Sequence, residues 1–519
     1  MDFTIKRIAG VSLVCLLSAV MASCTVQSEP DSGNGSGSSE GTNKGDTTIT
    51  TSDTIAIAWS GSAVSIEGAH EGVSVTNEGG YVTVTSTVEE SITYLLSGNG
   101  TGQLTIYGVY RHQLILNGLT LSCSDGPAIN NQCHKKCYVV LQGANSLSDG
   151  STYASSTEDR KAAFFSEGQM IFSGNGSLAV TGSYKHALAS DDYIRFAEST
   201  GALTLKAASD GIHTNDGIYF DGGTFVIEAG ADGVQCDTAT IVVNDGSITV
   251  TAATDKGIVA YDSIIVNGGT IRITSDYKCI KTKSALVING GDIQVVCKGE
   301  ASSGGGHGGG GWWAPGGGPG GSSSTENDSP EGIEAKGTIT INGGTVYSQS
   351  ADDAINSGGD LTINGGQVCA YSTGNDGLDA NGNCYIKGGL VYAIGARSPE
   401  VAIDANSEEQ KKLYISGGTI VAIGGLESGA QLSQTCYQAS SWSANTWYAL
   451  TVGSEVFAFI TPASGGSGMV VSGASQPTLK KSVSADGTAI FNSMGFYPAS
   501  VSGGSNVSLS TYSGGGGRW

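Results

Sequence analysis

Basic residues are scarce in this chain. Its 519 residues include 25 Lys and Arg against 47 Asp and Glu, which gives a formal net charge of −22. A chain of this charge is repelled by phosphate backbones, so nucleic acid is excluded as a partner. An acidic polysaccharide is repelled as well, unless a cation bridges the two.

Signatures of common catalytic and metal sites are missing too. The sequence has no P-loop, no hydrolase nucleophile motif and no Cys-X-X-Cys pair. His186, His213 and His307 show no paired ligand spacing, so we expect turn or solvated positions for them. Of the 11 cysteines, Cys15 and Cys24 lie near the N-terminus, and the odd number that remains favours isolated buried thiols plus a few disulfides.

Glycine is abundant instead. Its 81 residues are about double the average usage, yet no Gly-X-Y period accompanies them, which excludes collagen and favours many tight backbone positions. The length allows two to four ordinary domains or one elongated repeat domain.

The N-terminus reads as an export signal. Lys6 and Arg7 precede a short apolar stretch that ends in "MASC" at Cys24. This pattern resembles a bacterial lipoprotein signal and predicts a signal peptide over residues 1–23, with Cys24 as the lipidated first residue of the mature protein. An ordinary secretory signal is the alternative, and the stretch is too short for a convincing spanning helix.

A polar segment follows the signal. Residues 24–52 lack large apolar groups and predict a flexible tether. We therefore expect an extracytoplasmic, lipid-anchored monomer, at the outer membrane or the cell surface; the acidic residues Glu29 and Asp31 are compatible with surface export.

Comparison of the chain with itself reveals a repeat. Several segments follow one template of an acidic-glycine start, an alternating strand, a Gly-Gly or Asp-Gly turn and a second strand, among them "DKGIVAYDSIIVNGGTIRIT" and "EGIEAKGTITINGGTVYSQS". Asp245, Asn267 and Asn289 are 22 residues apart, as are Asn342 and Asn364. This spacing is too short for a crossover helix but fits one rung of a parallel β-helix, and it places the asparagines in a stack at the turns.

Aligned rungs show three columns. The first position, here named the charged column, holds Asp210, Asp232, Lys256, Lys278, Glu331, Asp353 and Asp376. The next position is small, which suits a tight corner: Gly211, Gly233, Gly257, Cys279, Gly332, Ala354 and Gly377. The third position is aliphatic and predicts an inward-facing stack: Ile212, Val234, Ile258, Ile280, Ile333, Ile355 and Leu378.

The repeat defines the domain organisation. We expect a β-rich N-terminal region over 53–150, a parallel β-helix over 151–430 with rungs of about 22 residues, and a C-terminal β cap over 431–519. The gap between Asn289 and Asn342 exceeds one period, so the glycine-rich segment 299–329 is predicted to be an insertion between two regular rungs. The fold class is therefore all-β.

The charged column requires compensation for its like charges. Rungs lie ~4.8 Å apart, where two unit charges repel by roughly 1 kcal/mol in water and more when partly buried. Bound calcium could offset this repulsion, as could the two lysines of the column, and the alternative is a set of solvated turn acids. The residues named as calcium ligands are Asp191, Asp192, Asp210, Asp216, Asp232, Asp255, Glu331, Asp353 and Asp376; Glu334, Asp352 and Asp379 lie near the last three.

Two groups of side chains suggest further chemistry. A lysine beside calcium is the base that β-elimination of uronates requires, which makes Lys256 and Lys278 the candidate catalytic residues, with Lys281 third; their alternative role is to relieve charge repulsion. Trp312 and Trp313, in the glycine-rich insertion, are candidate ligand-binding residues that stack on a sugar, or else they fold back onto an apolar patch.

Several motifs occur in the order seen in a known family. "LILNGLTL", "GPAINN", "CYVVLQGANSLSDGSTY", "AAFFSEGQMIFSGNGSLAVTGSYKHALASDDYI" and the rungs together resemble a bacterial extracellular carbohydrate-binding family with a polysaccharide-lyase-like right-handed parallel β-helix. The resemblance covers residues 53–480 and implies a surface protein that binds plant cell-wall glucan or pectic polygalacturonate, with calcium on turn aspartates. It supports Asp191, Asp210, Asp216 and Asp232 as ligands, and this chain departs from the family pattern at His186-Ala187, Lys256 and Lys278.

Three functions follow, in order. The first is a lipid-anchored, calcium-containing β-helix that binds polysaccharide and performs no chemistry. The second is a calcium-dependent polysaccharide lyase that uses Lys256 or Lys278. The third is a structural surface adhesin with a protein partner.

Overall fold

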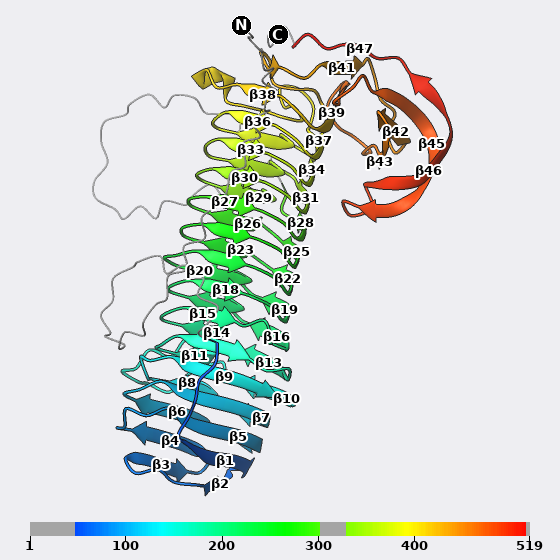
Figure 1. Cartoon of the computed structure of the whole chain (residues 1–519). Coiled ribbons are helices and arrows are strands. Elements are labelled where there is room, and N and C mark those ends of the chain that lie inside the picture. Colours follow the sequence, from blue (N-terminus) through cyan, green and yellow to red (C-terminus); the bar gives the residue numbers. More distant parts are fainter. Residues whose placement is uncertain (1–46, 301–328, 515–519) are drawn as a thin grey trace, which may run out of the picture. The chain divides into compact units, whose positions relative to one another are not determined.

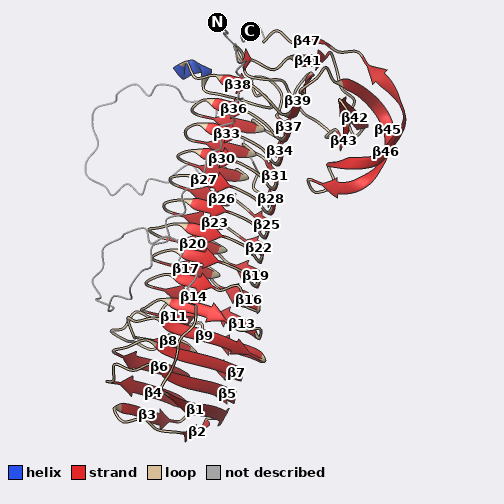
Figure 2. Cartoon of the chain, viewed as in Figure 1, coloured by secondary structure: helices blue, strands red, loops and turns tan. Residues whose placement is uncertain are grey.

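The computed structural model describes residues 47–300 and 329–514. They form a parallel β-solenoid in which short strands stack rung upon rung (Figures 1 and 2), as the repeat predicts. In these residues the one helix is a short 3-10 turn, η1 (Ser407–Glu409), and none is long and apolar enough to cross a membrane.

Each regular rung contributes one strand to each of three ladders. The first ladder belongs to a 13-stranded sheet: β3 (Val73–Glu78), β4 (Tyr81–Ser86), β6 (Gln103–Gly108), β8 (Ile129–Asn131), β11 (Ala162–Ser166), β14 (His186–Ser190), β17 (Ile212–Thr214), β20 (Val234–Cys236), β23 (Lys256–Ala260), β26 (Lys278–Thr282), β29 (Ile333–Ala335), β32 (Ile355–Ser357) and β35 (Leu378–Ala380). The second contains β9 (Cys137–Gln142), β12 (Met170–Ser173), β15 (Ile194–Phe196), β18 (Ile218–Phe220), β21 (Ile241–Val243), β24 (Ile264–Val266), β27 (Leu286–Ile288), β30 (Ile339–Ile341), β33 (Leu361–Ile363), β36 (Cys384–Ile386), β38 (Leu413–Ile415) and β40 (Gln431–Leu432). The third contains β10 (Ala144–Ser148), β13 (Ser177–Gly182), β16 (Ala202–Ala207), β19 (Thr224–Ala229), β22 (Ser247–Ala253), β25 (Thr270–Ser275), β28 (Asp292–Cys297), β31 (Thr345–Ser350), β34 (Gln367–Ser372), β37 (Leu390–Ile394) and β39 (Thr419–Ile423).

The N-terminal region is stacked on the same solenoid. Its remaining strands are β1 (Asp53–Gly61), β2 (Ala63–Glu67), β5 (Ile92–Thr101) and β7 (His112–Ser122). β1 pairs in parallel with β5 and β5 with β7, and β7 then pairs with both β9 and β10. The antiparallel hairpins β1–β2 and β3–β4 lie at this end of the stack (Figure 1), where an open solenoid would expose strand edges.

The aliphatic column faces inward, as its pattern predicts. All of its seven members are at most 1% exposed: Ile212, Val234, Ile258, Ile280, Ile333, Ile355 and Leu378. They belong to one continuous core that follows the stack. Full burial of such a side chain contributes about 1.5–3 kcal/mol, so the column is a main source of stability.

The asparagines form the predicted ladder at the turn after the second ladder. Each Nδ2 donates to the Oδ1 of the preceding rung at 2.8 Å, from Asn267 to Asn244, Asn289 to Asn267, Asn342 to Asn289 and Asn364 to Asn342. The turn then passes through Gly-Gly. At Gly366, φ is +81° and a Cβ would lie 2.8 Å from the Gly343 carbonyl carbon, so both conformation and space require glycine.

Space, rather than a tight corner, selects the small column. A Cβ at Gly211 would lie 2.3 Å from Ile227 Cγ2, and one at Gly332 would lie 2.0 Å from Ser348 Oγ. Neither glycine has a positive φ. The column is therefore small because the third-ladder strand packs directly against it.

The 53-residue gap in sequence between Asn289 and Asn342 does not disturb the register of the strands. β26 pairs directly with β29, Ile280 opposite Ile333, and Asn342 bonds Asn289 across 53 residues of sequence. The rungs on either side of the predicted insertion 299–329 are therefore stacked directly, and residues 301–328 themselves lie outside the described part of the chain.

A second β unit follows the solenoid. β42 (Trp447–Val452), β43 (Glu455–Ile460), β46 (Gly495–Val507) and β45 (Thr478–Ile490) close an antiparallel barrel, and β41 (Cys436–Ala439), β44 (Met469–Ser472) and β47 (Ser510–Thr511) complete the C-terminal segment. β44 pairs antiparallel with β39 and covers that edge. Phe457 and Phe459 pack with Tyr392 of the third ladder, whose hydroxyl donates to the Ile460 carbonyl at 2.8 Å.

The nine cysteines in the described part of the chain are all buried and free: Cys123, Cys133, Cys137, Cys236, Cys279, Cys297, Cys369, Cys384 and Cys436. The expectation of a few disulfides is wrong for these residues. They act as small apolar side chains in the core.

Candidate functional site

The charged column lies where the first ladder begins. Its acids are in the turn before each strand, and Lys256 and Lys278 are the first residues of β23 and β26. The column is largely buried rather than solvated. Six of its seven members are at most 8% exposed: Asp210 4%, Asp232 7%, Lys278 1%, Glu331 4%, Asp353 5% and Asp376 8%. Buried charges require hydrogen bonds or counter-charges, so the contacts of each group decide what the column does.

Acids of the column accept hydrogen bonds from the backbone of the next rung. Asp210 Oδ1 accepts the backbone N–H of Asp232 at 3.2 Å, and Asp232 Oδ1 accepts that of Lys256 at 2.9 Å. Asp353 Oδ1 accepts the N–H of Asp376 at 3.1 Å in the same manner. The acids therefore satisfy the N–H groups of the next rung, which explains why short acceptors recur at this position.

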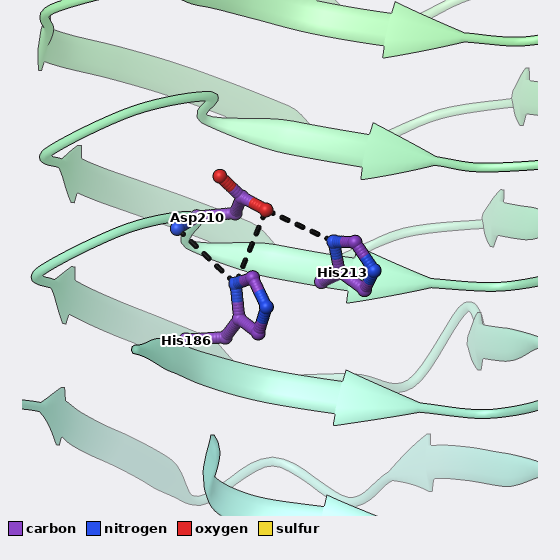
Figure 3. Close-up of side chains that lie close together, drawn as sticks. All are labelled: His186, Asp210 and His213. Carbon is purple, nitrogen blue, oxygen red and sulfur yellow. Dashed lines mark hydrogen bonds and ion pairs between the residues drawn. The ribbon is translucent and has the colours of Figure 1, made fainter. Parts of the chain in front are cut away.

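Two histidines join the column at its N-terminal end, where Asp210 lies between them (Figure 3). His186 Nδ1 accepts the Asp210 backbone N–H at 3.3 Å and also lies 3.1 Å from Asp210 Oδ2. His213 Nδ1 lies 2.9 Å from the same oxygen, and its Nε2 lies 3.3 Å from Asp237 Oδ2. Both rings are buried in β14 and β17, so the expectation of turn or solvated positions is wrong for them.

Burial and side-chain contacts shift the pKa of Asp210 in opposite directions. Burial would raise the pKa of Asp210, but its contacts with His186 and His213 lower that pKa overall. Burial lowers the pKa of His186. The carboxylate is thus held ionised beside a neutral His186 ring.

The geometry of the histidines argues against a shared ion. The ligand atoms of His186, Asp210 and His213 lie within 4.8 Å of one another. The two rings, however, are stacked, with centroids 4.3 Å apart and planes 18° apart. Because an imidazole lone pair lies in the plane of its ring, near-parallel rings do not converge on one metal ion. We interpret the trio as a polar core cluster.

Asp191, Asp192 and Asp216, the other acids predicted near Asp210, lie in turns at the opposite end of the first-ladder strands. Asp191 and Asp192 follow β14 and Asp216 follows β17, whereas the charged column precedes these strands. Asp191 forms an ion pair with Lys161, and Asp216 accepts from Thr238 Oγ1 at 2.9 Å. Burial raises the pKa of Asp192, with a further contribution from Asp216.

Lys278 lies at the centre of a buried ion cluster. Its Nζ is 2.7 Å from Glu331 Oε2 and 3.1 Å from Glu334 Oε2, and the three side chains are at most 5% exposed. Glu334 also pairs with Lys336. Burial raises the pKa of Glu331; burial would also raise that of Glu334, but Lys278 and Lys336 lower it overall. The ammonium group therefore offsets part of the negative charge of two carboxylates at this level of the column.

Lys256 is the other candidate base. Its Nζ lies 2.7 Å from Asp255 Oδ1, and its side chain is 13% exposed. Burial raises the pKa of the neighbouring Asp232 to about 7, against the lowering influence of Lys256. Lys281 is 5% exposed in β26 and pairs in register with Glu334. Each lysine thus lies among carboxylates of adjacent rungs.

The C-terminal end of the column is acidic without an interleaved lysine. Carboxylate oxygens of Asp376, Asp379 and Asp404 lie within 4.8 Å of one another. Burial raises the pKa of Asp376 to about 8, and Asp379, Glu400 and Glu427 raise it further, against the lowering influence of the Val401 N–H. Burial and Glu427 raise the pKa of Asp404 to about 10.

Asp353 extends the same cluster by one rung. Burial raises its pKa well above its ordinary value, and Asp379, Asp352 and Asp376 add to the effect. Converging carboxylates that raise one another's pKa form the type of oxygen donor set that Ca²⁺ prefers. The residues present therefore fit a calcium ion at Asp376, Asp379 and Asp404.

Sequence reasoning named Asp376 and Asp379 but missed Asp404 and Glu427. The rung that holds them departs from the template, since Ile403 makes only isolated bridges to Leu378 and Leu426. The repeated pairs Leu378-Asp379 and Ile403-Asp404 were the available signal. Trp312, Trp313, His307 and Cys24 lie outside the described residues.

The comparisons with known proteins give one family match and one structural match. Residues 78–377 match the family model of a carbohydrate-binding domain-containing protein. One solved structure, a gadolinium derivative of the polysaccharide lyase-like protein from C. thermocellum, matches with 20% identity and a TM-score of 0.37, over 47% of this chain and 92% of that chain. Among curated proteins, none matches.

Fold and site together define a parallel β-solenoid with a buried charged column along one of its turns. The family match spans more than half of the chain. The protein therefore belongs to the carbohydrate-binding domain-containing family, in accordance with the resemblance of its motifs.

Proposed function

We propose that this protein is a lipid-anchored surface protein that binds polysaccharide, with calcium in its solenoid and without catalysis of its own. The observation that carries the proposal is the convergence of Asp376, Asp379 and Asp404 on a solenoid of a carbohydrate-binding family. A calcium ion there would neutralise the carboxylates and offer a positive charge to an acidic glycan.

The net charge supports a cation as part of this function. At a formal −22 the protein repels pectic polygalacturonate, whereas a neutral cell-wall glucan is not repelled. We expect binding of an acidic glycan to depend on calcium and binding of a neutral glycan to be independent of it.

The contacts of the lysines argue against lyase activity. A base for β-elimination must be uncharged and must reach the substrate C5 proton. Lys278 is 1% exposed and paired with two carboxylates, and Lys256 is paired with Asp255. Both lysines are thus in contact with carboxylates of the protein itself, which supports charge compensation as their role.

Lipid attachment at Cys24 and a surface location belong to the same proposal. They are supported by the signal motif "MASC" and by the polar segment 24–52 that follows it. Mass spectrometry of the mature N-terminus would detect the acyl chains on Cys24. A mature protein that begins at another residue of the segment and carries no acyl chain would indicate a secreted protein.

One experiment tests binding and catalysis together. The purified protein is applied to immobilised polygalacturonate and to cellulose, with calcium or with chelator, while absorbance of unsaturated uronate is recorded. Retention without product supports the proposal. Product formation favours the lyase and would make Lys256 and Lys278 the residues to replace, and failure to bind either glycan would leave the adhesin function.

A further inference from the structure

A groove of about 590 Å³ lies between the third ladder and the C-terminal barrel. One wall is formed by the first residues of four successive strands, Thr345 of β31, Gln367 of β34, Leu390 of β37 and Thr419 of β39. The other wall is formed by Glu455 of β43 and Tyr497 of β46. Figure 1 shows the β45–β46 hairpin of the barrel beside these third-ladder strands.

The solenoid wall is periodic. Thr345 pairs in register with Gln367, Gln367 with Leu390, and Leu390 with Thr419. At ~4.8 Å per rung, the four positions span about 14 Å along the solenoid axis, enough for a few sugar rings. Thr345 Oγ1 donates to Gln367 Oε1 at 3.2 Å, and the Gln367 side chain also hydrogen-bonds Tyr497 of the opposite wall.

The floor of the groove lacks side chains. The residue before each wall position is a half-buried glycine with φ of +81° at 344, 366 and 389. A Cβ at each would lie at most 2.8 Å from the backbone of the rung below. The stacking of the rungs thus keeps a flat backbone surface that a ring can approach closely.

The barrel wall supplies an aromatic face and a carboxylate. Tyr497 is 40% exposed, and its ring is supported by Phe457, with centroids 6.1 Å apart. Burial and the nearby Glu455 raise the pKa of Tyr497, so its hydroxyl stays protonated at neutral pH. Glu455 is exposed at the end of the β42–β43 hairpin.

This combination of groups is suited to a neutral sugar. The C–H face of a pyranose stacks on an aromatic ring, while amide, hydroxyl and carboxylate groups pair with its hydroxyls. Among the described residues that line the groove none is a cation, and Glu455 would repel a uronate.

We propose that this groove binds a neutral glycan chain, such as a β-linked glucan, aligned with the solenoid axis and stacked on Tyr497. The inference deepens the proposed function and rests on it. It is specific to this chain's C-terminal part, because Leu390, Thr419, Glu455 and Tyr497 all lie beyond the family match at 78–377. An acidic glycan would be held at the calcium cluster instead.

The test measures binding of cellohexaose and of hexagalacturonate to the purified protein by calorimetry, with calcium present. Tyr497→Ala is expected to weaken cellohexaose binding about tenfold, the loss of one stacking contact. Thr345→Trp, which fills the solenoid wall without touching the barrel fold, is expected to abolish it. Tyr81→Ala is the matched control, since Tyr81 is 39% exposed but lies at the opposite end of the solenoid, in β4.

Each outcome decides between the proposals. Loss of cellohexaose binding in both groove variants, with hexagalacturonate binding and Tyr81→Ala unaffected, supports the groove. If the wild-type protein binds cellohexaose and neither groove variant weakens it, the groove inference is wrong while the proposed function stands. If the groove variants lose hexagalacturonate instead, the assignment to neutral glycans is wrong. A wild-type protein that binds neither oligosaccharide overturns the groove, and its failure on the polymers as well overturns the proposed function.

Discussion

Removal of the Lys278 ammonium group should destabilise the centre of the solenoid. Its distances of 2.7 and 3.1 Å to Glu331 and Glu334 correspond to about 6 and 5 kcal/mol of attraction at an effective dielectric constant of ~20. Desolvation of the three charges costs several kcal/mol per ion and offsets most of this. Lys278→Met keeps the volume but removes the positive charge that both carboxylates share, while Glu334 keeps its ion pair with Lys336. Loss of a buried counter-charge typically costs about 3–5 kcal/mol.

Lys256→Met provides the comparison within the same column. Lys256 Nζ lies 2.7 Å from Asp255 Oδ1, and because Asp255 is 38% exposed, solvent screens this ion pair. The expected loss is at most about 1 kcal/mol. The double substitution Lys278→Met with Glu331→Gln should recover part of the stability, because it also removes a buried carboxylate that has lost the Lys278 charge.

Hydrogen exchange is the suitable assay, because a solenoid need not unfold in one step. The informative amides are those of Ile280 and Ile333, which donate to Gly332 and Ala354 in the neighbouring rungs. The opening free energy at these amides should fall by several kcal/mol in Lys278→Met and little in Lys256→Met. Equal effects of the two substitutions, or a loss under about 1 kcal/mol in Lys278→Met, would refute the role of Lys278 as an internal counter-ion.

Three further predictions concern the acidic cluster and the turns. Asp404→Asn should reduce the number of calcium ions bound by one in calorimetry, whereas Asp245→Asn, at an exposed turn, should leave it unchanged. Because the folded pKa of Asp376 is raised from 3.8 to about 8, the calcium-free protein should lose stability as pH rises from 4 to 8, and a melting temperature that is flat in chelator would contradict this. Gly366→Ala should cost about 1–3 kcal/mol in thermal melts, since φ is +81° and the Cβ meets backbone at 2.8 Å; Gly425→Ala, with positive φ but open space, should cost less, and the reverse order would show that space does not decide.

The periodic parts of the solenoid could be predicted from sequence because one physical rule sets each column. Ile212 and its equivalents recur because every rung buries the same inward position, and Asn289 recurs because its amide bonds the same neighbour. Repetition lets a single sequence act as its own alignment. The register across the insertion followed from the same reasoning.

Contacts that depend on depth or on distant segments could not be predicted. Asp210 is buried and lies between His186 and His213 through contacts between adjacent rungs, and sequence spacing alone shows neither burial nor such contacts. The groove beside Tyr497 brings together residues from opposite sides of a long sequence gap. No period relates Tyr497 to Thr345, so only the folded chain reveals their proximity.

The undisturbed hydrogen bond between Asn289 and Asn342 has a consequence for how such proteins diversify. A segment that leaves the stack after β28 and returns before β29 alters no bond on either side of it. This turn is therefore a permissive graft site, where foreign peptides of differing length can be displayed while the framework stays the same. Laboratory engineering could use it for tags or binding loops, with the pairing of β26 with β29 expected to persist.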